Sequence, residues 1–324
     1  MAKRKPSWHF SRTDLAKTYL DSLEIGLVSA RALFAPRRHG KTEFLKLDMS
    51  PMAIERGYAV VYVNLWDNQE RPASALIDAL QAPQAKTSVL SRLSRGSTKS
   101  VKSVKLGGKF AALGEASAEV EWDKSGVTSS ELLDLHSELK KTAAKKRSTL
   151  LLVDEAHVLA DARHATLAAS LRAGLDIRKD AIKVIFTGSS EATLRRMFGQ
   201  IKQPFYNWAP IEPFPLLGRD FVEHQVATFN AVSRHELSVA QALRAFRKLH
   251  GVPEYFRRFL DELVTHSFDG LEVVLERTQS KIHDTQNYPK KWEQLKAIDR
   301  AVLSLAVTAA NSPHSLTTRT QLGE

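Results

Sequence analysis

The sequence contains no cysteine. This absence excludes disulfide bonds, thiolate metal sites and cysteine nucleophiles, and it fits a reducing compartment. No apolar run approaches the roughly 20 residues that cross a bilayer. The basic start, Met1 to Pro6, is followed by Ser-Trp-His-Phe rather than by the apolar core of a signal peptide. We therefore expect a cytoplasmic protein without a membrane partner.

Acidic residues are in deficit. The chain has 36 Asp and Glu against 47 Lys and Arg, a net charge of +11. A basic protein attracts polyanions, nucleic acid above all, because binding releases counterions. A generally basic proteome or a phosphate-rich ligand explains the same charge. A hydrophobic content of 43% is ordinary for a folded core, and 324 residues suffice for two domains.

Four short apolar runs alternate with helical patterns. The runs are apolar on both faces, as buried parallel strands are: Arg31–Ala35, Tyr58–Val63, Leu150–Val153 and Ile182–Phe186. Helical patterns begin at Lys41 and Glu191 and cover Ala73–Leu80, Ser129–Lys146 and Ala162–Leu175. This alternation predicts an α/β fold, a parallel sheet covered by helices on both faces.

One segment departs from this alternation. Residues 98–124 surround a glycine pair and predict an inserted β-hairpin, basic in its first half and acidic in its second. Opposite charges across a hairpin pair with each other; a DNA-contacting arm is the alternative. Four prolines between 204 and 215 then mark a boundary. Beyond it we predict only helices, at Arg219–Val232, Ser238–Leu249, Pro253–Ser267, Gly270–Ile282 and Trp292–Ala309.

Residues 35–42 fit a phosphate-binding loop between a strand and a helix. They follow the pattern Gly/Ala, four residues, Gly-Lys-Thr, and read Ala35-Pro36-Arg37-Arg38-His39-Gly40-Lys41-Thr42. We expect the backbone N–H groups of this loop to surround a phosphate, with the positive end of the next helix pointing at it. Lys41 would bridge the β- and γ-phosphates of a nucleotide, and the Thr42 hydroxyl would ligate Mg²⁺.

Two carboxylates follow the third predicted strand. They are Asp154 and Glu155, at the end of a strand where ligands bind in open α/β sheets. Asp154 would hold Mg²⁺ through water, and Glu155 would act as the general base on the attacking water. A strand that merely ends in two acids is the alternative. The phosphate loop upstream favours the catalytic interpretation.

Polar and basic residues follow the fourth predicted strand. Thr187 and Ser189 are candidate sensors of the γ-phosphate, whereas Ser190 fits the cap of the next helix. On that helix, Arg195 and Arg196 are candidates for an arginine finger that reaches a neighbouring subunit. A solvated basic face is the alternative interpretation of these two arginines.

Four ordered motifs resemble the archaeal-type ATPase family, which lies between the AAA+ and STAND ATPases and is similar to the origin-recognition ATPases. The motifs are Pro36–Thr42, Leu151–Glu155, Phe186–Ser190 and Gly251–Pro253. The resemblance covers about residues 8–265, with Ala35 in place of the family's first glycine. It implies an αβα nucleotide-binding domain followed by a helical lid and often a winged helix. It also implies that Pro253 contacts the nucleotide. Independently of the resemblance, Arg257 or Arg258 on the helix that Pro253 opens is a candidate to reach back to the nucleotide.

We therefore expect four parts along the chain. These are an N-terminal linker or helix at 1–22, a P-loop NTPase domain at 23–213, a helical lid at 214–290 and a last segment at 291–324. The last segment fits either a helical tail or a truncated winged helix, with helices at 292–309 and 315–324.

The combined hypothesis is an ATPase that acts as a conformational switch. ATP with Mg²⁺ would close the lid, in a homo-oligomer as one option, and hydrolysis would reopen it, with DNA or a partner protein as the cargo. Asp154–His157 also spells the DEAH signature of helicases, but a helicase needs a second RecA-like domain and only helices are predicted after Ser190. His157 is then a polar residue at a helix start. Two further hypotheses are a phosphotransferase and a non-hydrolysing switch.

Overall fold

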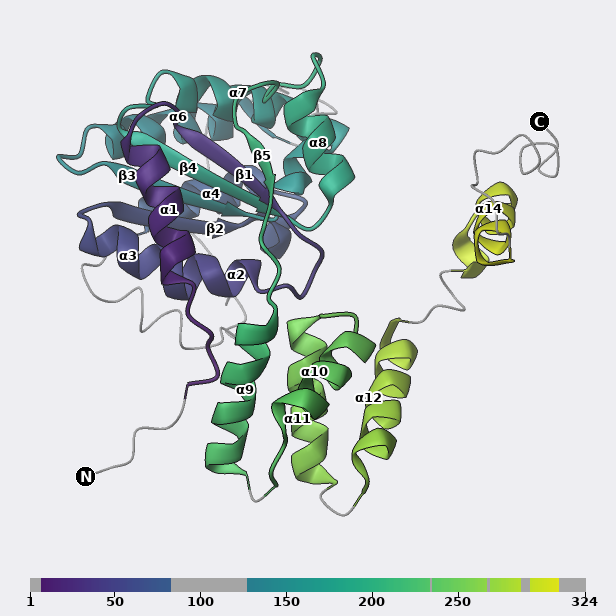
Figure 1. Cartoon of the computed structure of the whole chain (residues 1–324). Helices are drawn as coiled ribbons and strands as arrows, with labels where there is room; N and C mark the ends of the chain where they lie inside the picture. The colour runs from purple at the N-terminus through teal and green to yellow at the C-terminus, as the bar shows by residue number, and fades with distance from the viewer. Residues whose placement is uncertain (1–6, 83–126, 234, 267–268, 287–291, 309–324) are drawn as a thin grey trace, which may run out of the picture. The chain divides into compact units, whose positions relative to one another are not determined.

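The computed structural model describes residues 7–82, 127–233, 235–266, 269–286 and 292–308 (Figure 1). It divides into two compact units, one of Ser7–Gly218 and one that begins at Arg219. The predicted hairpin at 98–124 and the predicted helix at 315–324 lie outside the described residues.

The unit of Ser7–Gly218 contains a five-stranded sheet in which every pairing is parallel. Its spatial order is β2-β3-β4-β1-β5. The strands are β1 (Ala30–Phe34), β2 (Ala59–Asn64), β3 (Thr149–Asp154), β4 (Ile182–Gly188) and β5 (Ile211–Pro213). This confirms the predicted α/β parallel sheet.

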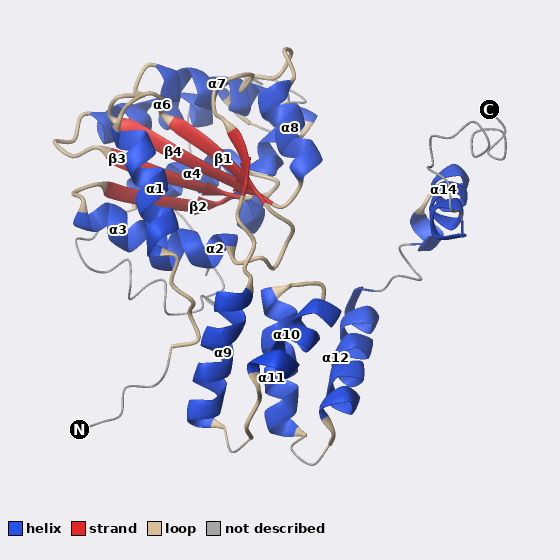
Figure 2. Cartoon of the chain, in the orientation of Figure 1, coloured by secondary structure: helices blue, strands red, loops and turns tan. Residues whose placement is uncertain are grey.

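Helices cover both faces of this sheet (Figure 2). One face packs against α1 (Thr13–Glu24), α2 (Lys41–Phe44) and α3 (Ser50–Glu55). The other packs against α4 (Pro72–Gln81), α6 (Ser129–Ala143), α7 (Ala165–Asp176) and α8 (Glu191–Gly199). Along β3, Leu150 and Leu152 enter one core while Leu151 and Val153 enter the other. Two buried faces explain why the strands read as continuous apolar runs.

Several boundaries differ from the sequence predictions. The sequence does not predict the last strand, β5, because its three residues lie among the prolines that we interpret as a boundary. It is an edge strand that ends in Pro213, where a missing N–H costs no ladder hydrogen bond. The helix predicted at Ser129–Lys146 ends at Ala143, and Ala162–His164 form a 3₁₀ turn before α7.

The helix after the phosphate loop is continuous but irregular. A π-turn at Leu45–Met49 joins α2 to α3. Pro51 follows it, and a proline inside a helix has no N–H to donate and its ring crowds the carbonyl four residues back. The wider π-turn accommodates this residue, and both the N–H and the Oγ of Ser50 donate to the Leu45 carbonyl, the hydroxyl at 2.7 Å.

The second unit is helical throughout its described residues. Its helices are α9 (Arg219–Val232), α10 (Val239–Lys248), α11 (Pro253–Thr265), α12 (Leu271–Gln286) and α14 (Ala297–Thr308). Phe221, Phe246 and Phe256, one from each of the first three helices, pack with ring centroids 5.5–6.2 Å apart. The helix predicted from Trp292 has its long part from Ala297 onward.

Candidate functional site

The sheet order brings the predicted site residues of the first unit to one edge. β4 lies between β1 and β3, so the loop after β1, the turn after β3 and the end of β4 are neighbours at the carboxyl ends of the strands. This is the edge at which open α/β sheets bind ligands.

The loop at 35–40 has the backbone conformation of an anion cradle. Arg38 and Gly40 are both left-handed, with φ of 70° and 81°. Such residues within a turn point successive N–H groups to one side. A Cβ built on Gly40 would meet no atom within 4 Å, so the space above the loop is open. The buried His39 fixes the turn from inside, with its Nδ1 2.9 Å from the Arg37 carbonyl oxygen.

Lys41 begins α2 and turns its side chain back over this loop. Its Nζ donates to the carbonyl oxygens of Ala35 at 2.6 Å and Pro36 at 3.0 Å. The residue is 5% exposed. Burial lowers the pKa of Lys41, although the negative charges of Glu155 and Asp154 oppose this shift. The two carbonyl groups that accept from Lys41 are neutral. An anion bound in the loop would therefore supply the negative charge that balances the Lys41 ammonium.

Asp154 is fully buried at the end of β3 and gathers four donors. One oxygen, Oδ2, accepts from Thr42 Oγ1 at 2.5 Å and from the Tyr62 hydroxyl at 3.0 Å. The other accepts from the Thr187 hydroxyl and from Glu155 N at 3.1 Å. Burial and the neighbouring Asp154 carboxylate raise the pKa of Tyr62. The structure thus brings Thr42 and Asp154 into direct contact.

Glu155 has a left-handed backbone, with φ 54° and ψ 41°, a conformation that costs a non-glycine residue about 1–3 kcal/mol. Its Oε2 accepts from Ser189 N at 3.0 Å and lies 3.0 Å from His157 Nδ1. Burial alone would raise the pKa of Glu155, but the contact with His157, the Ser189 hydrogen bond and the charge of Lys41 outweigh it and lower the pKa. Glu155 is therefore ionised at neutral pH.

The candidates on and around α8 have different surroundings. Ser190 caps α8, since its Oγ accepts from Thr193 N at 3.3 Å, which confirms that prediction. Arg195 is exposed, and its Nε donates to Glu191 Oε1 at 2.8 Å. Arg196 donates to the Ala160 carbonyl at 3.3 Å.

The two candidates in the helical unit lie at the start of α11. Pro253 is in the first turn of this helix, two residues after Gly251, whose φ is 67°. Arg257 lies one turn further along α11.

Three residues of the site are missed or underestimated by sequence reasoning. Tyr62 lies on β2, and Trp66 follows it in a 3₁₀ turn at Leu65–Asn68. The Trp66 ring packs against His157, with centroids 5.4 Å apart, and the Arg37 guanidinium lies 4.2 Å from the Trp66 ring centre. His157 is thus more than a polar residue at a helix start. The position of Tyr62 and Trp66 at the carboxyl end of a strand was the available signal.

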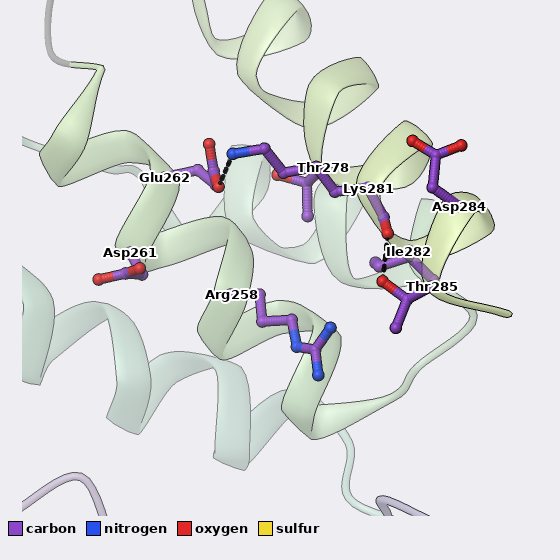
Figure 3. Close-up of a pocket in the computed structure, with 8 residues that line it drawn as sticks. All are labelled: Arg258, Asp261, Glu262, Thr278, Lys281, Ile282, Asp284 and Thr285. Atoms are coloured by element: carbon purple, nitrogen blue, oxygen red, sulfur yellow. Dashed lines mark hydrogen bonds and ion pairs between the residues drawn. The ribbon is translucent and has the colours of Figure 1, made fainter.

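A cavity of about 400 Å³ lies between α11 and α12 of the helical unit (Figure 3). Among its charged side chains, Lys281 pairs with Glu262, and Arg258 pairs with Glu254 on its own helix. Thr278 and Thr285 donate to helix carbonyls. We assign no ligand to this cavity.

Within the described ranges, no helix combines the length and apolar character that crossing a bilayer requires.

Comparison with solved structures shows the fold. The Walker-type ATPase PABY2304 of Pyrococcus abyssi matches with a TM-score of 0.55 at 18% identity, over 99% of this chain and 90% of that one. The Aeropyrum pernix ORC2 protein in its ADPNP–ADP complexes matches with a TM-score of 0.58 at 14% identity, over 95% and 77%. The Aeropyrum pernix ORC1 protein in complex with DNA gives 0.51 at 12%, over 96% and 75%.

These likenesses show that the chain shares its fold with this Walker-type ATPase and with the two ORC proteins, the fold that the motif resemblance implied. No family model and no curated protein sequence matches the chain.

Proposed function

We propose that this chain, which has the fold of the origin-recognition-type AAA+ ATPases, binds ATP with Mg²⁺ and hydrolyses it. The observation that carries the proposal is the contact of Thr42 Oγ1 with Asp154 Oδ2 at 2.5 Å, beside a buried Lys41 and an ionised Glu155. These residues lie far apart in the sequence, in the helix after β1 and the turn after β3, and the fold brings them to one edge of the sheet.

The residues present fit a Mg²⁺ ion. While Thr42 donates its proton to Asp154, its oxygen keeps lone pairs for a metal. Asp154 would take a metal-bound water in place of one of its hydroxyl donors, such as Tyr62. In the part of the chain that the structure describes, no three His, Asp or Glu side chains form a metal cluster. Nucleotide oxygens and water would therefore complete the shell, as Mg²⁺ usually requires. The ion would neutralise charge on the phosphate oxygens.

Each of the chain's own groups has a separate task in this proposal. The N–H groups of the loop and the Lys41 ammonium bind phosphate oxygens and stabilise the charge that develops on them. Glu155, ionised at neutral pH, accepts a proton from the attacking water. Ser189 N holds the Glu155 carboxylate in place, and Thr187 does the same for Asp154.

The test is ATP binding and turnover by the wild type, by Glu155→Gln and by Glu70→Gln as the control. Glu70 is an exposed glutamate in an ion pair with Arg163, away from the phosphate loop. We expect Glu155→Gln to keep ATP affinity and lose turnover by about 10²-fold or more, with Glu70→Gln unchanged. Binding without turnover in the wild type would favour a non-hydrolysing switch, and no ATP binding would refute the proposal.

A helicase is the less favoured candidate. The described residues after β5 form helices only, so they supply no second RecA-like sheet for the Asp-Glu-Ala-His sequence to work with.

The cycle around this site extends the proposal to the whole chain. ATP would close the helical unit over the sheet, with Pro253 and Arg257 contacting nucleotide, and Arg195 or Arg196 would serve a neighbouring subunit in a homo-oligomer. The net charge of +11 supports DNA as the partner, with a partner protein as the second candidate.

A further inference from the structure

Five residues form a closed ring of contacts beside the phosphate loop. Glu155 Oε2 contacts His157 Nδ1 at 3.0 Å, and the His157 ring packs on Trp66. Arg37 covers Trp66, with its guanidinium carbon 4.2 Å from the ring centre, and its Nε donates to Ser189 Oγ at 3.5 Å. Ser189 N closes the ring on Glu155 Oε2 at 3.0 Å. The members come from the phosphate loop, the turn after β2, the turn after β3 and the end of β4.

From this ring we infer that His157 is a positioning residue for Glu155, and that Trp66 and Arg37 make its position depend on the state of the phosphate loop. The inference rests on the proposed ATPase function. It assigns roles to three residues, Arg37, Trp66 and His157, that hydrolysis by Lys41, Asp154 and Glu155 does not by itself require.

The Glu155 carboxylate has little else to orient it. Its backbone is left-handed and begins a short 3₁₀ turn, so its own element does not fix the side chain. Ser189 N donates to Oε2 on one side. On the other, His157 Nδ1 lies 3.0 Å from Oε2, within ion-pair distance but outside hydrogen-bond geometry in this arrangement. His157 is in turn fixed by the face of Trp66, with the two rings inclined by 40°. Removing the imidazole nitrogen would leave Glu155 bound on one side only.

Arg37 can contact either Trp66 and Ser189 or a phosphate bound in the loop, and these two arrangements compete. Its side chain is exposed on the phosphate loop, where it stacks on Trp66 and reaches Ser189. A guanidinium binds phosphate oxygens through charge-assisted, often bidentate hydrogen bonds, which are stronger than a cation–π contact at an exposed site. A phosphate in the loop would therefore draw Arg37 from Trp66 and Ser189. The ring would open at that point, and Trp66 and His157 would shift against Glu155.

Trp66 makes this coupling measurable, because the residue is 40% exposed and its indole lies between a cation and an imidazole. The experiment titrates the full chain with ADP and Mg²⁺ and records tryptophan fluorescence. We expect a change at saturating ADP that disappears in Trp66→Phe and shrinks at least about threefold in Arg37→Ala. Trp208→Phe is the matched control, since Trp208 also carries an arginine, Arg172, at 5.0 Å but lies outside the ring; it should keep the change.

Turnover tests the positioning role separately. His157→Phe keeps an aromatic ring against Trp66 and removes the nitrogen. We expect it to lower ATP turnover about tenfold, part of what a general base contributes, with ATP affinity within about twofold of the wild type. Equal losses of affinity and turnover would indicate a structural role and overturn the inference.

The outcomes separate this inference from the proposed function. Wild-type turnover in His157→Phe, or an ADP signal that persists in Trp66→Phe, overturns the ring while leaving the ATPase intact. A wild type that binds ATP without turnover overturns the proposed function and the positioning role together.

Discussion

The carboxylate of Asp154 receives four donors, and their chemistry makes a specific prediction for Asp154→Asn. The two donors on Oδ2, Thr42 and Tyr62, are hydroxyls that can rotate and accept instead. An amide NH₂ placed there would remain satisfied but would use a lone pair of Thr42 Oγ1 that the metal needs. We expect Mg²⁺-dependent ATP affinity to fall at least about tenfold, while stability falls by only about 1–2 kcal/mol, the difference between charged and neutral acceptors.

Nucleotide titrations with and without Mg²⁺, together with urea unfolding, check this prediction. Asp180→Asn, at an exposed turn, is the control. Unfolding of Asp154→Asn at all urea concentrations would show that the buried network needs the negative charge itself.

His9 ties the N-terminal segment to the helix after the phosphate loop. It lies 2.8 Å from Glu43 Oε1 and 3.0 Å from Asp48 Oδ1. Hydrogen bonds to Asp48 and then Glu43 raise the pKa of His9 from 6.5 to about 9. Because the folded pKa is raised, the stabilisation is complete below pH 6.5 and is lost as the pH rises through about 9.

We therefore expect His9→Gln to cost about 1–3 kcal/mol of unfolding free energy at pH 6 and almost nothing at pH 9.5. Urea unfolding of both proteins at pH 6, 7.5 and 9.5 measures the difference. Thr18→Ala, on the exposed side of α1, is a control with no ionisable group. A loss that is the same at every pH would show that the ion pairs contribute nothing.

At the scale of elements, Ser190 has a structural role in α8, whereas its neighbour Ser189 contacts Glu155. Ser190 Oγ accepts from Thr193 N and caps α8, and losing such a cap costs about 1 kcal/mol. We expect Ser190→Ala to lower stability by that amount and Ser190→Asp to restore it, with ATP turnover changed less than about twofold in both. A loss of turnover without a loss of stability would place Ser190 in the catalytic machinery.

The strands with long apolar runs were predictable because both of their faces are buried. The phosphate loop and the Asp154–Glu155 pair were predictable as motifs, since their chemistry depends on local spacing. The β5 strand was not predictable, because three residues among prolines are too few to show the hydrophobic pattern of a strand. The ring through Arg37, Trp66 and His157 could not be found either, because its contacts depend on the strand order β2-β3-β4-β1 and no spacing in the sequence encodes that order. The π-turn at Leu45–Met49 has a local sequence signal in Pro51, which cannot donate the N–H of a regular helix.

At the scale of the whole molecule, positive charge collects at the sheet edge opposite the phosphate loop. The end of α6 and the loop before β3 expose Lys140, Lys141, Lys145, Lys146 and Arg147, which we call the basic edge. Lys141 pairs with Glu138 at 2.7 Å. The loop is anchored to the sheet, since Ser148 O accepts from Ala59 N at 2.9 Å. Among the described residues of the Ser7–Gly218 unit, the basic edge offers DNA a run of exposed cations away from the phosphate loop.

If DNA is the partner, the basic edge predicts its salt dependence. Each phosphate contact removed lowers the slope of log K against log salt by about 0.9, so Lys145→Ala, Lys146→Ala and Arg147→Ala together should lower it by about 2–3. The control is Lys17→Ala with Lys202→Ala, two exposed lysines elsewhere. Duplex-DNA binding measured by anisotropy from about 50 to 200 mM salt, with and without ATP, tests this. An unchanged slope in the triple variant would show that DNA contacts another surface of the protein. No wild-type binding even at the lowest salt would exclude DNA and leave the ATPase proposal standing, because the basic edge and the phosphate loop lie at opposite ends of the strands and act on different ligands.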